Sequence, residues 1–92
     1  SDGEVFSEHV KVLKLGTLIG TRTWGGLIGI INMIPLVDGG MLTQSNVGFA
    51  NLHGQWVVEN HGVDPDIVVE NSPEDVLAGK DHQLEKAIEV IE

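Results

Sequence analysis

Several residue types are scarce in this chain, and each scarcity excludes a class of protein. There is no cysteine, so neither a disulfide framework nor a thiolate metal site can form. Lysine and arginine number 5 against 14 aspartate and glutamate residues, which gives a net charge of −9. This balance argues against nucleic acid or an anionic membrane surface as a partner. The longest apolar run, residues 27–35, is too short to cross a bilayer. The lack of cysteine fits a reducing compartment.

The residues that are present predict one small unit of mixed α/β structure. A chain of 92 residues with 41% apolar content holds at most one small domain. Apolar residues recur every three or four positions over residues 1–15 and again over 81–91, which predicts a helix at each end. Ser72 and Asp81 are expected to cap a short helical turn and the last helix. Short strands are expected between the helices, over residues 17–23, 27–31, 34–37, 41–43, 47–50, 56–58 and 67–69.

The sequence Trp24-Gly25-Gly26 interrupts this run of strands. We expect at least one of the two glycines to have a positive φ, and Trp24 to be partly buried. The chain also opens directly on a helix-start pattern, Ser1 to Glu4, without a preceding segment. We therefore expect it to be a piece of a longer polypeptide.

A polar cluster follows the predicted strand at 56–58. Glu59, Asn60 and His61 stand where that strand opens into a loop, before the turn signal Asp64-Pro65-Asp66. Polar residues in a loop at the end of a rigid strand often form a catalytic or binding site. The alternative is that these residues have no functional role and simply form a polar strand end with an ordinary turn. No histidine pair has a metal-ligand spacing, so no metal site is expected.

Ser1 also has two interpretations. Ser1 and Glu4 match the capping box, in which each side chain satisfies a backbone N–H of the first turn. Alternatively, Ser1 is a nucleophile at a helix start, and the backbone N–H of Asp2 points toward the oxyanion formed on attack. A serine nucleophile needs a base. His9 lies too far along the helix, and no spacing favours His61.

Taken in order, the motifs of the chain resemble the carboxyl-terminal end of the tricorn-type branch of the tail-specific serine peptidases. The resemblance extends over essentially all 92 residues. The matching motifs lie at residues 1–4, 18–26, 35–40, 43–44, 56–66 and 73–87.

The resemblance implies a role for each matching residue. Ser1 corresponds to the nucleophile, the amide of Asp2 to an oxyanion-hole donor, and Glu59 to the glutamate of a Ser-His-Ser-Glu tetrad. The histidine and second serine of that tetrad lie upstream of residues 1–92 in the family. His61 is not expected to replace that histidine, and the 92 residues alone are expected to be inactive.

The resemblance also implies a fold and an activity. The fold would be part of a ClpP/crotonase-like catalytic domain, with short twisted strands between an N-terminal and a C-terminal helix. The full-length protein would be a cytoplasmic, homo-oligomeric serine peptidase that hydrolyses oligopeptides without a cofactor. The alternative is an inactive segment that serves packing or subunit contact.

Overall fold

The structure, a computed structural model, describes residues 1–92 and contains three helices and four short strands. This mixture agrees with the predicted α/β class. In chain order the elements are α1 (Asp2–Val12), β1 (Ile19–Gly20), β2 (Asn32–Pro35), β3 (Met41–Gln44), β4 (Ile67–Val68), α2 (Pro73–Leu77) and α3 (His82–Ile91).

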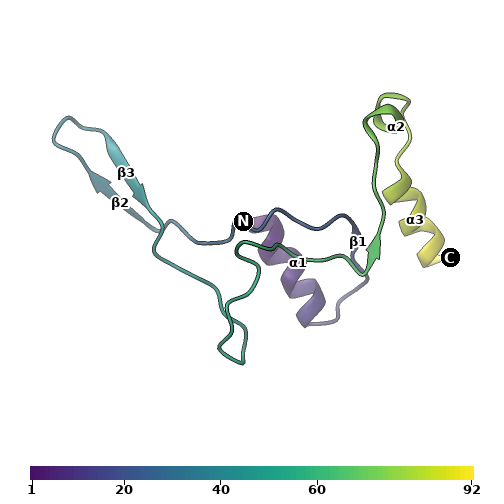
Figure 1. Ribbon diagram of the computed structural model, residues 1–92, viewed down its shortest axis with the longest axis horizontal. Coiled ribbons are helices and arrows are strands. Elements are labelled where there is room, and N and C mark those ends of the chain that lie inside the picture. The colour runs from purple at the N-terminus through teal and green to yellow at the C-terminus, as the bar shows by residue number, and fades with distance from the viewer.

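The chain is extended. It measures 56 × 38 × 18 Å and has a radius of gyration of 17.6 Å. A compact chain of this length would have a radius of about 12 Å. The β2–β3 hairpin projects from one end, α2 and α3 lie at the other, and α1 lies between them (Figure 1). None of the helices is long and apolar enough to cross a membrane.

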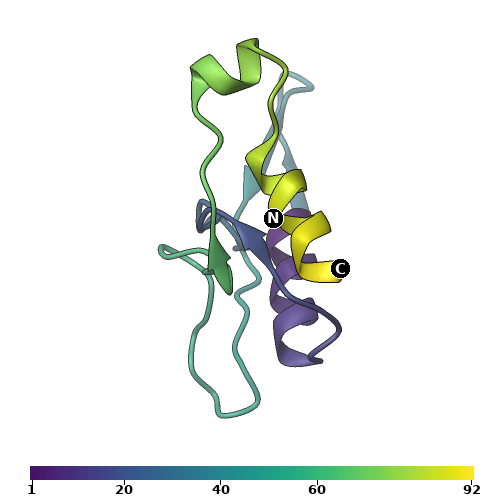
Figure 2. The ribbon, with the colours of Figure 1, turned by 90° about the vertical axis from the view of Figure 1, so that its right-hand side faces the viewer.

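Two small sheets organise the chain. β1 and β4 pair in parallel, with Ile19 opposite Ile67 and Gly20 opposite Val68. α3 lies beside β1, and the Gln83 side chain of α3 donates a hydrogen bond to the Val69 carbonyl over 3.0 Å. This arrangement is visible from the side in Figure 2. β2 and β3 form a separate antiparallel hairpin.

The strands are fewer and shorter than the sequence predicts. The expected strand at 17–23 is reduced to Ile19–Gly20, and residues 27–31 and 47–50 form only isolated bridges. The strand predicted at 56–58 is wrong: Trp56 makes one bridge, and Val58 has a φ of +71°, which cannot continue an extended strand. The strand predicted at 67–69 is confirmed as β4.

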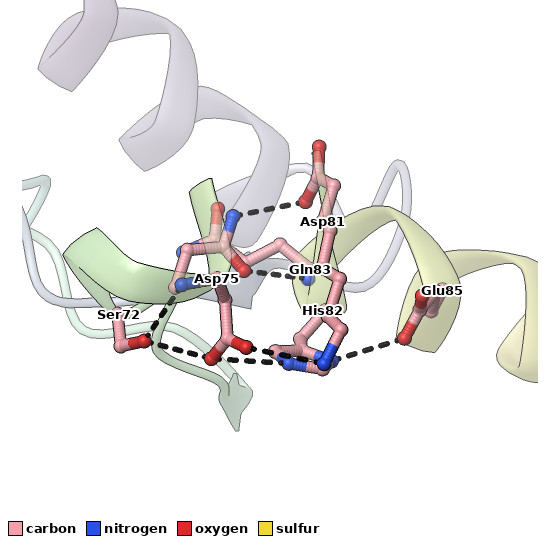
Figure 3. Close-up of polar contacts among 8 residues, drawn as sticks. Ser72, Asp75, Asp81, His82, Gln83 and Glu85 are labelled. Carbon is pink, nitrogen blue, oxygen red and sulfur yellow. Dashed lines mark hydrogen bonds and ion pairs between the residues drawn. The ribbon is translucent and has the colours of Figure 1, made fainter. Parts of the chain in front are cut away.

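The helix starts illustrate which local signals hold. Ser72 accepts a hydrogen bond from the Asp75 amide, as predicted (Figure 3). Asp81 accepts one from the Leu84 amide, also as predicted. The capping box, one of the two interpretations of Ser1, does not form, because the Ser1 side chain makes no capping bond. Trp24 is 88% exposed, which contradicts the predicted partial burial. The adjacent Gly25 packs inward in its place, against the backbone of residues 61 and 62.

Only 7 of the 92 residues are buried. The apolar core consists of Leu27, Val58 and Val63, with Val5, Leu18 and Val57 packed against it. Glu4 is the one charged residue among the buried seven. The small core therefore lies where α1 meets the loops at residues 23–28 and 57–63, which are the segments that hold the candidate site.

Candidate active site

Ser1 is the exposed N-cap residue of α1. Its carbonyl accepts hydrogen bonds from the amides of Glu4 and Val5, at 3.0 and 2.9 Å. These bonds fix its backbone as the start of the helix, while its hydroxyl makes no bond to the helix. The next amide, that of Asp2, is among the first helical N–H groups, which have no partner within a helix. A free hydroxyl therefore stands next to unpaired N–H groups at the positive end of a helix dipole.

Glu4 turns away from the helix start and into the core. Its Oε1 accepts from the Thr23 hydroxyl at 2.5 Å and from the Gly25 amide at 2.6 Å, and its Oε2 accepts from the Gly26 amide at 2.9 Å. The bond from Thr23, together with those from the two amides, lowers the pKa of the Glu4 carboxyl against the opposing effect of burial. Glu4 is therefore held as a carboxylate that joins α1 to the loop at residues 23–26.

The loops at 23–25 and 60–63 are bonded to each other. The Thr23 amide donates to the Val63 carbonyl at 3.1 Å, and the Val63 amide donates to the Thr23 hydroxyl at 2.7 Å. The Asn60 amide donates to the Gly25 carbonyl at 2.8 Å. Position 60 therefore cannot move relative to Gly25 without the loss of this bond.

Glu59 directly precedes the loop at residues 60–63. Its Oε2 accepts from the amides of Leu27 and Ile28, at 2.6 and 2.9 Å. Both bonds end on one oxygen, so Oε1 can accept from another group. The half-buried Glu59 borders an open cavity of about 460 Å³. The other lining residues are Ile28, Ser45, Asn46, Val47, Gly48, Phe49, Trp56 and Asn60.

The backbone on either side of Glu59 is strained. Val58 and Asn60 have φ values of +71° and +65°. Positive φ is a true outlier for a β-branched residue such as Val58, and less so for asparagine. The Glu59 amide bonds the Val57 carbonyl at 2.8 Å, which closes a tight three-residue turn around Val58. Burial of the Val58 side chain holds this conformation. Strain of this kind is concentrated at functional positions.

The histidine side chains form their hydrogen bonds with residues other than Ser1 and Glu59. His61 pairs with Asp64, with 2.6 Å between Nε2 and Oδ2, on the exposed surface, and its carbonyl accepts from Arg22. The hydrogen bond from His61 lowers the pKa of Asp64. No histidine of the chain bonds to Ser1 or Glu59.

The structure thus connects Ser1 and Glu59 through intermediates that the sequence did not reveal. Glu4, Thr23 and Gly25 form that connection. The signal for Glu4 was ambiguous, because an acidic residue three positions after a serine also fits a capping box. The best sign of a close backbone contact in the sequence is the Gly25-Gly26 pair. A positive φ was expected there, and Gly25 has a φ of +97°.

Comparison with known proteins gives the chain its family. Residues 1–69 match the model of Peptidase family S41. The chain is 50% identical over 91 residues to the tricorn protease of Thermoplasma acidophilum, covering 99% of this chain and 8% of that protein. It is 48% identical over 88 residues to tricorn protease homolog 1 of Streptomyces coelicolor, covering 96% of this chain and 8% of the relative.

A solved structure agrees. The crystal structure of the tricorn protease superposes with a TM-score of 0.89 at 49% identity, covering 99% of this chain and 9% of that one. The chain thus spans less than a tenth of the length of these relatives. The resemblance to tricorn-type serine peptidases is confirmed, and the chain belongs to peptidase family S41.

Proposed function

We propose that this chain supplies Ser1 as the nucleophile and Glu59 as the orienting carboxylate of a serine peptidase that hydrolyses oligopeptides. The histidine and second serine of a Ser-His-Ser-Glu tetrad would come from residues outside 1–92. The observation that carries the proposal is the arrangement of the two groups. The Ser1 hydroxyl is unbonded at a helix start, Glu59 has one oxygen unbonded, and both are fixed to the loop at residues 23–28.

In this reaction the Ser1 Oγ attacks the peptide carbonyl carbon and its proton passes to the histidine. The carbonyl oxygen becomes an oxyanion that accepts from the Asp2 amide, which the helix start leaves unpaired. The C–N bond then breaks, and the leaving amine takes the proton from the imidazolium. Water hydrolyses the resulting acyl-enzyme by the reverse sequence of proton transfers. Glu59 orients its partner in the relay and stabilises the positive charge on the imidazole through the unbonded Oε1.

The wider setting belongs to the same proposal. Residues 1–92 would be the carboxyl-terminal part of a ClpP/crotonase-like catalytic domain in a cytoplasmic homo-oligomer. The low burial of this chain, 7 residues of 92, supports a segment whose remaining apolar surface is covered by other parts of the protein. The same observation favours the second candidate, an inactive segment whose role is packing or subunit contact.

Fluorophosphonate labelling of the full-length protein separates the two functions. The probe should attach to Ser1, located by peptide mapping, and Ser1→Ala should abolish both labelling and peptide hydrolysis. Ser7→Ala is the matched control, because Ser7 lies on the same helix and its hydroxyl already donates to the Gly3 carbonyl at 2.8 Å. The 92-residue chain alone should not be labelled. Hydrolysis that survives Ser1→Ala would end the assignment of Ser1 and leave the packing function.

A further inference from the structure

Four consecutive backbone amides hold two carboxylates in this structure. The amides of Gly25 and Gly26 donate to Glu4, and the next two, of Leu27 and Ile28, donate to Glu59. We propose that Glu4 is a positioning residue for peptide hydrolysis, which sets the relative placement of the Ser1 helix start and the Glu59 carboxylate through the segment at residues 25–28. This inference rests on the proposed function.

The burial of Glu4 indicates more than a packing role. Glu4 is 5% exposed, and burying a carboxylate is costly unless it is fully hydrogen bonded. An apolar side chain of similar volume commonly serves packing equally well or better. What the carboxylate adds is direction, since two oxygens accept three hydrogen bonds from fixed donors. Those donors belong to the segment that also bonds Glu59.

The connection from Glu4 to Ser1 is short and rigid. Glu4 lies in the first turn of α1, where its amide donates to the Ser1 carbonyl at 3.0 Å. A change in the position of the Glu4 carboxylate relative to residues 25–26 therefore moves the helix start, with Ser1 and the Asp2 amide, as one body.

The connection from the segment to Glu59 is equally constrained. One carboxylate oxygen of Glu59 bonds two successive amides, and the amide of the following residue, Asn60, bonds the Gly25 carbonyl. The segment at 25–28 spans at most about 14 Å even when fully extended, so the two carboxylates share one short support. A misplacement of about 1 Å between catalytic groups can cost up to about 100-fold in rate.

The test uses the full-length protein carrying Glu4→Gln, with Glu8→Gln as the matched control. Glutamine keeps the size of the side chain but places an NH₂ group opposite a donor, so at least one of the three bonds is lost. Glu8 lies one turn further along α1, and its carboxylate makes no hydrogen bond to the chain. The measurements are active-site titration with a fluorophosphonate, the labelling rate per titrated site, kcat, KM and Tm.

A positioning role predicts that Glu4→Gln lowers kcat and the labelling rate per titrated site by about 10- to 100-fold while KM changes little. Glu8→Gln should match the wild type in all of these. A merely structural role predicts the other pattern, with fewer active sites and a lower Tm but an unchanged rate per site. That pattern would overturn the inference.

Thr23 provides a second test if Glu4→Gln does not fold. Thr23→Val removes the hydroxyl that donates to Glu4 and accepts from the Val63 amide, whereas Thr23→Ser keeps a hydroxyl for both bonds. The valine variant should lose rate per site and the serine variant should recover it. Equal rates in both would contradict the proposal.

Ser1→Ala, measured in parallel, separates the positioning role of Glu4 from the proposed function. If it retains activity, the proposed function fails. If it is inactive while Glu4→Gln and Thr23→Val keep full rates, only the positioning role fails.

Discussion

Gly25 and Gly62 lie with their backbones in contact and leave no room for a side chain between them. A Cβ atom on Gly25 would lie 2.7 Å from the His61 nitrogen and 2.8 Å from the Gly62 nitrogen. Both glycines have positive φ, +97° and +93°. This contact brings the loop that bonds Glu4 against the loop that carries Glu59, so the absence of two side chains allows the site to form.

Gly25→Ala should therefore destabilise the protein, whereas Gly26→Ala should cost much less. At Gly25 the new methyl group meets backbone atoms, which cannot move aside, and the positive φ adds about 1–3 kcal/mol of strain. At Gly26 the close atoms belong to the indole of the exposed Trp24, which can rotate away. Gly16→Ala is the control, since it has open space around it. Free energies of unfolding from denaturant titration of the three variants check this order. Equal, small losses at Gly25 and Gly16 would contradict the close contact.

Glu59→Gln should affect rate far more than stability. Glutamine retains an oxygen that can accept from Leu27 and Ile28, so the local fold should survive. Loss of the charge that orients the relay should lower kcat by about 10²- to 10⁴-fold. Glu70→Gln, at an exposed carboxylate with no hydrogen bond, is the control and should leave kcat unchanged. Kinetics and Tm on both variants make the comparison, and a fully active Glu59→Gln would end the catalytic assignment of this residue.

His82 should make the stability of the α2–α3 region depend on pH. Its two ring nitrogens lie 3.3 Å from Asp75 and 3.0 Å from Glu85 (Figure 3). The hydrogen bond to Glu85, with the charge of Asp75, raises the pKa of His82 above its ordinary value of 6.5. The raised value means that the folded state favours the charged form. The stabilisation that charged His82 gives the folded state is fully present below about pH 6.5. It is lost as the pH rises through the folded-state pKa of His82.

The measurement is the Tm of the wild type and of His82→Gln at about pH 6 and about pH 9. The difference between the two proteins should be larger at the lower pH. Asp75 stays ionised throughout, because the hydrogen bond from Ser72 and its partner His82 lower its pKa. His53→Gln, in an exposed turn, is the control and should show no such trend. A difference that does not change with pH would contradict the pH-dependent stabilisation by the pairs that His82 forms with Asp75 and Glu85.

Local signals in the sequence predicted the helices well. Ser72 and Asp81 cap α2 and α3 because a short polar side chain reaches an amide only three residues away. Such a contact depends on neighbours in the chain and on nothing else. The turn before Trp56 is local for the same reason: the Asn51 side chain bonds the amides of His53 and Gln55.

The architecture of the site could not be predicted in this way, because it depends on contacts between distant segments. Glu4 bonds residues 19 to 22 positions away, and Glu59 bonds residues 31 and 32 positions away. The same contacts explain the error at 56–58. Valine favours strands, but burial of Val58 beside Leu27 and Val63 outweighs that preference and holds a positive φ. Ser1 and Glu59 became candidate catalytic residues through the resemblance of whole motifs, which carries long-range information that residue preferences lack.

The 92-residue chain on its own should self-associate through the β2–β3 hairpin. The hairpin is an unattached two-stranded sheet with exposed apolar residues, including Met33, Ile34, Met41 and Leu42, which are 43–60% exposed. Open strand edges and contiguous apolar surface both favour association in water.

Ile34 and Leu42 are directly opposite in the register, so Ile34→Lys with Leu42→Glu places a compatible charge pair across the strands. This double variant should shift the sedimentation profile toward monomer. Leu77→Lys with Val76→Glu, at the exposed apolar surface of α2, is the matched control and should leave association unchanged. A wild-type chain that sediments as a monomer and melts cooperatively would show that the hairpin needs no cover.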